Sequence, residues 1–178
     1  MGLTDDKTKE CEKAILRIAS GDGEALSVIY ESYGRLIYST ALTVMRDAGK
    51  AEDVLQDVML RLLRYSGSYK KGTDPRAWIM RMTKNCALDA LKRDPPVSAL
   101  PEDAADGDEF PDDFDDALGH AALRDAVESL GETDQRIVKL RAYSGYSHGE
   151  IAEMLGISAA LVRKRYERAI KKLGKMLG

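Results

Sequence analysis

The 178-residue sequence contains few of the residues that build metal sites, disulfides and nucleophilic catalytic sites. Its two cysteines, Cys11 and Cys86, and its two histidines, His120 and His148, each lack a suitably spaced companion. Because metal ligands and catalytic partners occur in spaced sets, we expect no catalytic residue, no metal site, no cofactor and no enzymatic activity. Both cysteines are interpreted as reduced thiols, with a redox role as the minor alternative.

Long apolar runs and aromatic residues are also scarce. No run approaches the ~20 apolar residues that a membrane-spanning helix needs, and the first residues lack the basic and apolar segments of a secretory signal. We therefore expect a cytoplasmic protein without membrane insertion. Aromatic residues make up 6% of the chain, with two Phe and one Trp, which is few for a β-sandwich or barrel. These absences favour an all-α fold.

Acidic residues, by contrast, are concentrated in one segment. Residues 94–118 contain ten Asp and Glu, no Lys or Arg, and four of the five prolines. Since proline interrupts helices, this segment is interpreted as an acidic linker. The rest of the chain has 27 basic and 20 acidic residues, a net charge of +7 against −3 for the whole chain. This distribution is compatible with a polyanionic partner.

Outside the linker, apolar residues recur at three- and four-residue intervals, as in amphipathic helices. The pattern predicts helices at 7–19, 24–46, 51–64, 75–93, 121–130, 133–143, 148–155 and 158–177. Residues 47–49 are predicted to break a helix, and 65–73 to form a loop. Side-chain caps are predicted at Asp74, Thr133, Ser147 with Glu150, and Ser158. We expect two small helical domains, residues 1–93 and 119–178, joined by the acidic linker 94–118.

Residues 147–158 have the plan of a helix-turn-helix. Ala152 is small where two helices would cross, Gly156 lies at the turn, and Ile157 is an apolar plug. Residues 158–178 then contain seven Lys and Arg and a single acidic residue, Glu167. A basic helix of this kind fits the major groove between phosphates. A solvated face, a membrane surface or an acidic protein partner is the alternative, and the preceding turn favours DNA.

Six segments, three in each half of the chain, together resemble one protein family. The segments LGETDQRIV (130–138), GYSHGEIA (145–152) and LGIS (155–158) resemble conserved region 4 of bacterial sigma factors. The segments GDGEAL (21–26), AEDVLQDV (51–58) and PRAWIMRMTKN (75–85) resemble region 2 of the extracytoplasmic-function (ECF) group. The resemblance extends over about residues 15–177. It implies binding to core RNA polymerase, recognition of promoter DNA at the minus-ten element by region 2 and at the minus-thirty-five element by region 4, and help in strand separation.

The same resemblance implies roles for individual residues. The residues that match a polymerase-docking face are Asp53, Gln56 and Asp57. The residues that match the minus-ten loop and the helix beside it are Ser68, Lys70, Lys71, Trp78, Arg81, Lys84 and Asn85. The residues that match the minus-thirty-five recognition helix are Ser158, Leu161, Arg163, Lys164, Arg165 and Arg168. A solvated polar face, with Trp78 in the core, is the alternative interpretation of the minus-ten set.

The sequence departs from the family pattern at three places. Gly131 replaces a usual proline, Gly149 is a weak helix former, and Ala160-Leu161 stands where Gly-Thr is usual. Leu161 has no hydroxyl that could donate a hydrogen bond to a phosphate. We therefore expect the minus-thirty-five contacts of this chain to differ from the usual family pattern. The resemblance also implies an anti-sigma factor as a partner. Two other functions stay open, namely an autonomous helix-turn-helix regulator and a sigma-like decoy for an anti-sigma factor.

Overall fold

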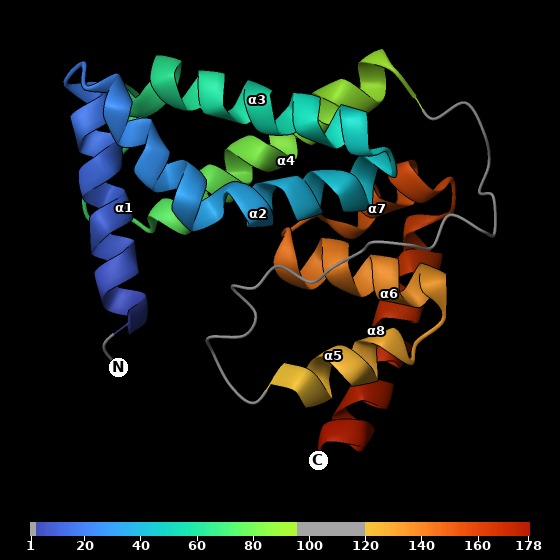
Figure 1. Cartoon of the computed structure of the whole chain (residues 1–178). Helices are drawn as coiled ribbons and strands as arrows, with labels where there is room; N and C mark the ends of the chain where they lie inside the picture. The colour runs from blue at the N-terminus through green and yellow to red at the C-terminus, as the bar shows by residue number, and fades with distance from the viewer. Residues whose placement is uncertain (1–2, 96–119) are drawn as a thin grey trace. The chain divides into compact units, whose positions relative to one another are not determined.

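The computed structural model describes residues 3–95 and 120–178 (Figure 1). Most of the predicted acidic linker, residues 96–118, lies outside the described residues. The described residues contain eight α-helices and no strand, which confirms the all-α prediction. They form two compact units, one on each side of the undescribed segment. No helix in the described ranges is long and apolar enough to cross a membrane.

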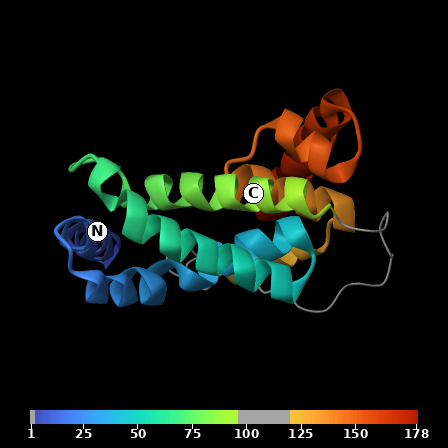
Figure 2. The same cartoon turned by 90° about the horizontal axis from the view of Figure 1, so that it is seen from above.

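The first unit is built from four helices. These are α1 (Leu3–Ala19), α2 (Leu26–Met45), α3 (Ala48–Tyr65) and α4 (Pro75–Arg93), with short 3-10 turns η1 (Gly23–Ala25) and η2 (Ser66–Ser68). Helices α2, α3 and α4 lie alongside one another, and α1 runs across the end of this group at η2 and the start of α4 (Figures 1 and 2). The loop that follows η2 is therefore held between helices of the same unit.

Most of the apolar positions given by the helical period form the core of the first unit, whereas Tyr30 and Leu63, which the same period places on apolar faces, are 55% and 42% exposed. Fully buried side chains occur on all four helices, at Ile15, Ile29, Ile37, Val44, Val54, Val58, Leu62 and Ile79. Burying such side chains contributes about 1.5–3 kcal/mol each relative to exposure. This core fixes the direction in which the polar faces of α3 and α4 point.

The predicted break between α2 and α3 is in part wrong. Arg46 ends α2 in the left-handed conformation, with φ 53°. Asp47 then caps α3, because its carboxylate accepts a hydrogen bond of 2.9 Å from the Lys50 N–H. Ala48 and Gly49 consequently form the first turn of α3, three residues before the predicted start. An Asp before a helix acts as a cap, and the sequence prediction treated it as a breaker.

The second unit is a smaller helical bundle. It contains α5 (His120–Glu128), α6 (Glu132–Val138), a π-helical turn η4 (Lys139–Tyr143), α7 (His148–Leu155) and α8 (Ala159–Leu177). Helix α8 packs against α5, α6 and α7. One core cluster of this unit consists of Ala126, Val127, Leu130, Val138, Ala169 and Leu173, with Leu123 and Tyr166 packed at its edge.

Three predictions for this unit are wrong in detail. Gly131, in place of Thr133, is the residue before α6, and it makes no side-chain cap because glycine has no side chain; Thr133 lies in the first turn of the helix. The helix predicted through Tyr143 changes to a π-helical turn at Lys139. The helical period of residues 158–177 also places Ile170 and Leu177 on the apolar face of α8, but both side chains are more than 40% exposed. Helices α5, α6 and α7 therefore bury only part of the apolar face of α8 that the helical period predicts.

Candidate functional site

The helix-turn-helix is held in shape by local hydrogen bonds. The Ser147 hydroxyl accepts a hydrogen bond from the Glu150 N–H (3.2 Å), and the Glu150 carboxylate accepts one from the Ser147 N–H (2.8 Å). This is the predicted capping box at the start of α7. Gly156 ends α7 with φ 64°, a conformation that favours glycine. The turn therefore has a defined geometry that sets the angle at which α8 leaves.

Helix α8 begins at the predicted cap. The Ser158 hydroxyl accepts a hydrogen bond of 3.2 Å from the Leu161 N–H. Val162 is fully buried, whereas Leu161 is 41% exposed. The exposed side of the helix presents a row of basic side chains at Arg163, Lys164, Arg168, Lys171, Lys172 and Lys175. One face of α8 thus packs into the core, and the opposite face presents positive charge to solvent. A helix that lies in a DNA groove needs this arrangement.

Two of the predicted DNA-contacting arginines have a partner within the unit. Arg165 forms an ion pair of 2.6 Å with Asp134 on α6, and Arg168 lies 3.5 Å from the same carboxylate. The Asp134 side chain is only 17% exposed. Arg165 is therefore partly used to join α8 to α6, in contrast to the exposed Arg163. Asp134 is a residue that the sequence prediction missed, because it lies 31 positions from its partner.

The predicted minus-ten loop contains a tight turn. The Thr73 N–H donates to the Lys70 carbonyl (3.1 Å), and the Thr73 hydroxyl donates to the same oxygen (2.7 Å). Gly72, the third residue of this turn, has φ 83°, as in a type II turn. Lys70 and Lys71 are exposed at its first two positions, and Ser68 is exposed just before it. The turn therefore presents two cations side by side on a hydrogen-bonded frame.

Tyr69 connects this loop to α4. Its ring packs edge-on against Trp78, with 5.4 Å between the ring centroids. Its hydroxyl lies 2.6 Å from the Thr73 carbonyl oxygen and 3.2 Å from a Glu12 carboxylate oxygen. Burial raises the pKa of Tyr69 above its ordinary value. Trp78 itself is partly buried, so the structure brings this predicted residue to the loop without burying it fully in the core.

The other predicted minus-ten residues continue along α4. The carboxylate of Asp74 accepts a hydrogen bond of 2.9 Å from the Arg76 N–H, which confirms the predicted cap of this helix. Arg81 and Asn85 are exposed, and Lys84 between them is partly buried. Successive turns of α4 therefore extend a polar, cationic strip away from the Trp78 end.

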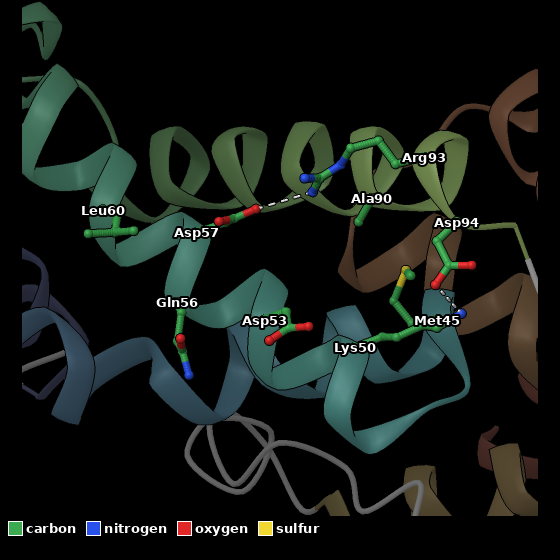
Figure 3. Close-up of a pocket in the computed structure, with 9 residues that line it drawn as sticks. All are labelled: Met45, Lys50, Asp53, Gln56, Asp57, Leu60, Ala90, Arg93 and Asp94. Atoms are coloured by element: carbon green, nitrogen blue, oxygen red, sulfur yellow. Dashed lines mark hydrogen bonds and ion pairs between the residues drawn. The ribbon is translucent and has the colours of Figure 1, made fainter.

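The predicted polymerase-docking residues border a cleft on the first unit. The cleft has a volume of about 380 Å³ and lies between α3 and α4 (Figure 3). Asp53 and Gln56 are exposed, and Asp57 lies 3.4 Å from Arg93. Leu60, one turn further along α3, is 63% exposed. The face thus combines carboxylate, amide and apolar surface.

A second ion pair closes one end of the same cleft. Lys50 at the start of α3 lies 2.8 Å from Asp94, the first residue of the predicted linker (Figure 3). Exposed pairs of this kind contribute about 0.2–1 kcal/mol. Their main effect here is to hold the end of α4 beside α3.

The two cysteines are both buried, one in α1 and one in α4. Burial raises the pKa of Cys11 to about 12, and the negative charge of Asp74 adds to the effect. Burial also raises the pKa of Cys86 to about 11. Among the described residues, no group of three or more His, Cys, Asp and Glu side chains could hold a metal ion.

Two helical units, the second containing a helix-turn-helix with a basic second helix, define a DNA-binding transcription factor of the all-α class. The family model for Sigma-70 region 2 matches residues 29–94, and the model for Sigma-70, region 4 matches residues 120–173. The RNA polymerase sigma factor CarQ of Myxococcus xanthus is 30% identical over 165 residues, which cover 91% of this chain and 94% of that protein.

Two further similarities agree. The ECF RNA polymerase sigma factor BldN of Streptomyces coelicolor is 27% identical over 97% of this chain and 68% of that protein. The solved structure of CnrH in complex with the cytosolic domain of CnrY has a TM-score of 0.50 and 20% sequence identity, covering 94% of this chain and 97% of that one. This structural likeness bears on the fold alone.

The chain belongs to the sigma factor family of bacterial RNA polymerase, in its ECF group. It is a transcription initiation factor that acts through promoter recognition. Sigma factors are transcription factors rather than enzymes.

Proposed function

We propose that this chain docks on core RNA polymerase through the exposed face of α3 that contains Asp53, Gln56 and Asp57. The support is the composition of that face, in which carboxylate and amide groups stand beside the exposed apolar side chain of Leu60. Basic side chains on the polymerase would meet the carboxylates, and an apolar contact at Leu60 would add affinity. Asp57 would remain linked to Arg93 and so stay oriented.

The minus-ten element is bound by the loop after η2 and by α4. Lys70 and Lys71 contact phosphates from the tight turn. Ser68 lies beside them, and since its hydroxyl donates to the Tyr65 carbonyl (2.7 Å), its oxygen accepts a hydrogen bond from a base N–H. Trp78 offers part of its ring for stacking on an unpaired base, a contact worth about 1–3 kcal/mol per base. The polar strip of Arg81, Lys84 and Asn85 follows the separated strand along α4. The observation that favours this assignment is the packing of Tyr69 between loop and helix, which keeps them in register.

The minus-thirty-five element is read in the major groove by α8. Ser158 stands at the amino terminus of the helix, where backbone N–H groups favour a phosphate. Arg163 and Lys164 extend from the exposed face, and Arg168 and Arg165 contribute beside the Asp134 carboxylate. Leu161 supplies an apolar contact of the kind that suits a thymine methyl group. This last contact replaces the hydroxyl that the family pattern would offer.

The domain boundaries follow from these roles. Residues 1–93 carry polymerase docking and the minus-ten contacts, residues 119–178 carry the minus-thirty-five contacts, and the acidic residues 94–118 join them. The protein acts in the cytoplasm as a non-enzymatic subunit. As the resemblance to the ECF group implies, we also propose an anti-sigma factor as the inhibitory partner of this chain.

The experiment is transcription of genomic DNA fragments by core polymerase with and without the purified protein, followed by sequencing of the transcript 5′ ends. We expect starts that share two upstream elements at a fixed spacing. Three variants test the surfaces separately, D53A/Q56A for docking, K70A/K71A for the minus-ten element and R163A/K164A for the minus-thirty-five element. Matched controls are Glu31→Ala on α2 and Lys13→Ala on α1, both at exposed positions outside the assigned surfaces.

Each alternative has its own signature in this experiment. Tight operator binding without polymerase would favour an autonomous regulator over a sigma factor. Binding of an inhibitor protein without any new transcript would favour a decoy. Loss of transcripts in the three variants, with both controls active, would support the assigned surfaces.

A further inference from the structure

Glu12 on α1 contacts the loop assigned to the minus-ten element, although it lies before the residues that match region 2, 29–94. One oxygen of its carboxylate accepts a hydrogen bond of 2.5 Å from the Gly72 N–H. The same oxygen lies 3.2 Å from the Tyr69 hydroxyl. A single side chain thus joins α1 to two residues of a loop about 60 positions further along the chain.

The contact with Gly72 selects one form of the turn. Type I and type II turns differ by rotation of the central peptide, here Lys71–Gly72, which reverses the direction of the Gly72 N–H. With φ 83° at Gly72, the turn is of type II. An acceptor placed 2.5 Å from this N–H therefore stabilises type II over type I. Charged acceptors make hydrogen bonds about twice as strong as neutral ones.

The contact with Tyr69 extends the same arrangement to the aromatic side of the loop. Tyr69 is 7% exposed and packs edge-on against Trp78. Its hydroxyl stands between Glu12 and the Thr73 carbonyl. One carboxylate on α1 is thus linked through Gly72 to the turn that carries the exposed Lys70 and Lys71. Through Tyr69 it is also linked to Trp78.

We propose that Glu12 is a positioning residue for minus-ten recognition, which fixes the turn that carries Lys70 and Lys71 relative to Trp78. This inference rests on the proposed function of the loop. It makes an unusual prediction about charge. Removing an acidic group near a DNA-binding surface ordinarily strengthens DNA binding, whereas loss of a positioning carboxylate weakens it.

The test uses holoenzyme assembled from the full chain and core polymerase. Its ligand is a DNA fragment whose minus-ten element is single-stranded and which lacks a minus-thirty-five element. Glu12→Ala should weaken binding about tenfold, the equivalent of 1.4 kcal/mol, and leave the affinity for core polymerase unchanged. Glu12→Gln should restore most of the binding, because its amide oxygen still accepts from the Gly72 N–H. Glu10, exposed on another face of α1, provides the matched control in Glu10→Ala.

A second pair of variants tests the turn from its other side. Gly72→Ala places a side chain at φ 83°, and Gly21→Ala does so at φ 99° in the turn after α1. Neither added Cβ meets an atom within 4 Å, so both variants have backbone strain alone. Only Gly72→Ala should weaken binding to the single-stranded minus-ten DNA. The fluorescence of Trp78, the only tryptophan, should change in Glu12→Ala and Gly72→Ala and stay as in the wild type in both controls.

The outcomes are distinct. Unchanged or tighter DNA binding by Glu12→Ala, or equal defects in Glu12→Ala and Glu12→Gln, would overturn the positioning role while the wild type still binds. Failure of the wild-type holoenzyme to bind the minus-ten DNA would overturn the proposed function of the loop and, with it, this inference. Weak binding by Glu12→Ala with rescue by Glu12→Gln would support both.

Discussion

Arg163 and Arg165 are two positions apart on α8, and their surroundings give them different roles. Arg163 is exposed to solvent. The Arg165 guanidinium is paired at 2.6 Å with Asp134 on α6. A charge that already has an internal partner attracts a phosphate less than an exposed one, since the two opposite charges largely cancel at a distance. Two arginines that are close together in the sequence of α8 are therefore not expected to contribute equally to DNA binding.

This difference leads to a paired prediction. Arg163→Ala should weaken binding of the holoenzyme to the minus-thirty-five element by about 1–3 kcal/mol. It should also reduce the slope of log affinity against log salt concentration by about one. The thermal stability of the protein should not change. Arg165→Ala should instead lower the stability of the second unit by about 1 kcal/mol or less, with a smaller loss of DNA binding. DNA affinity at several salt concentrations and thermal unfolding measure the two effects. Equal DNA-binding defects and equal stabilities would contradict the assignment.

The cysteines give a prediction about reactivity. With pKa values of about 12 and 11, Cys11 and Cys86 should be at most about 0.1% thiolate at pH 8, against about 10% for a thiol of pKa 9. Iodoacetamide should therefore label neither residue in the folded protein and both in urea. Because folding raises these pKa values, stability should be constant below about pH 8 and fall as the pH rises above about 9. Rapid labelling of native Cys11 or Cys86 would revive the redox alternative.

Residue identity was more predictable than residue contact. The resemblance to the ECF group assigns Lys70, Lys71 and Trp78 to the minus-ten set. Glu12 and Asp134 could not be assigned from the sequence, because each acts on a partner many positions away and neither belongs to a local pattern. An acidic side chain on an amphipathic helix is ordinarily solvated, so its sequence context contained no signal for these contacts.

At the scale of helices, local capping patterns were the most reliable signals. Asp74, Ser147 and Ser158 cap the helices that they were predicted to cap, because the cap and its N–H donor are within three residues of each other. The predicted cap at Thr133 was wrong, and the predicted break at 47–49 was wrong in part, because two possible caps or breakers stand close together at each place. The π-helical turn at Lys139–Tyr143 was not predicted, because the apolar period of residues 133–143 does not distinguish a π-helical turn from an α-helix.

Two glycines of the helix-turn-helix test this element directly. Gly156→Ala should lower the stability of the second unit by about 1–2 kcal/mol, because Gly156 has φ 64° while no atom lies within 4 Å of an added Cβ. Gly149→Ala, inside α7, should raise stability by about 0.5–1 kcal/mol, since the nearest atom to its Cβ is 3.9 Å away. Thermal unfolding followed by circular dichroism distinguishes them. Shifts of the same sign would show that the turn geometry is wrong.

At the scale of the whole molecule, basic and acidic residues are concentrated in different parts of the sequence. The basic residues of α8 and of the minus-ten loop lie in different units, while ten of the thirty acidic residues lie in 94–118, which contains no Lys or Arg. The net charge of −3 therefore conceals two cationic surfaces suited to one polyanion. The all-α class and the presence of two units could be predicted from helical period and proline content. The order of regions 2 and 4 along the chain fits recognition of two promoter elements by one protein.

The most direct test of this two-element recognition is a combined footprint on a single promoter. DNase protection locates the bound elements, and permanganate detects unpaired thymines. We predict that holoenzyme protects both elements at a fixed spacing and exposes reactive thymines at the minus-ten element, and that the protein alone does neither. Protection by the protein without core polymerase, or protection by the holoenzyme of one element without strand separation, would contradict the account.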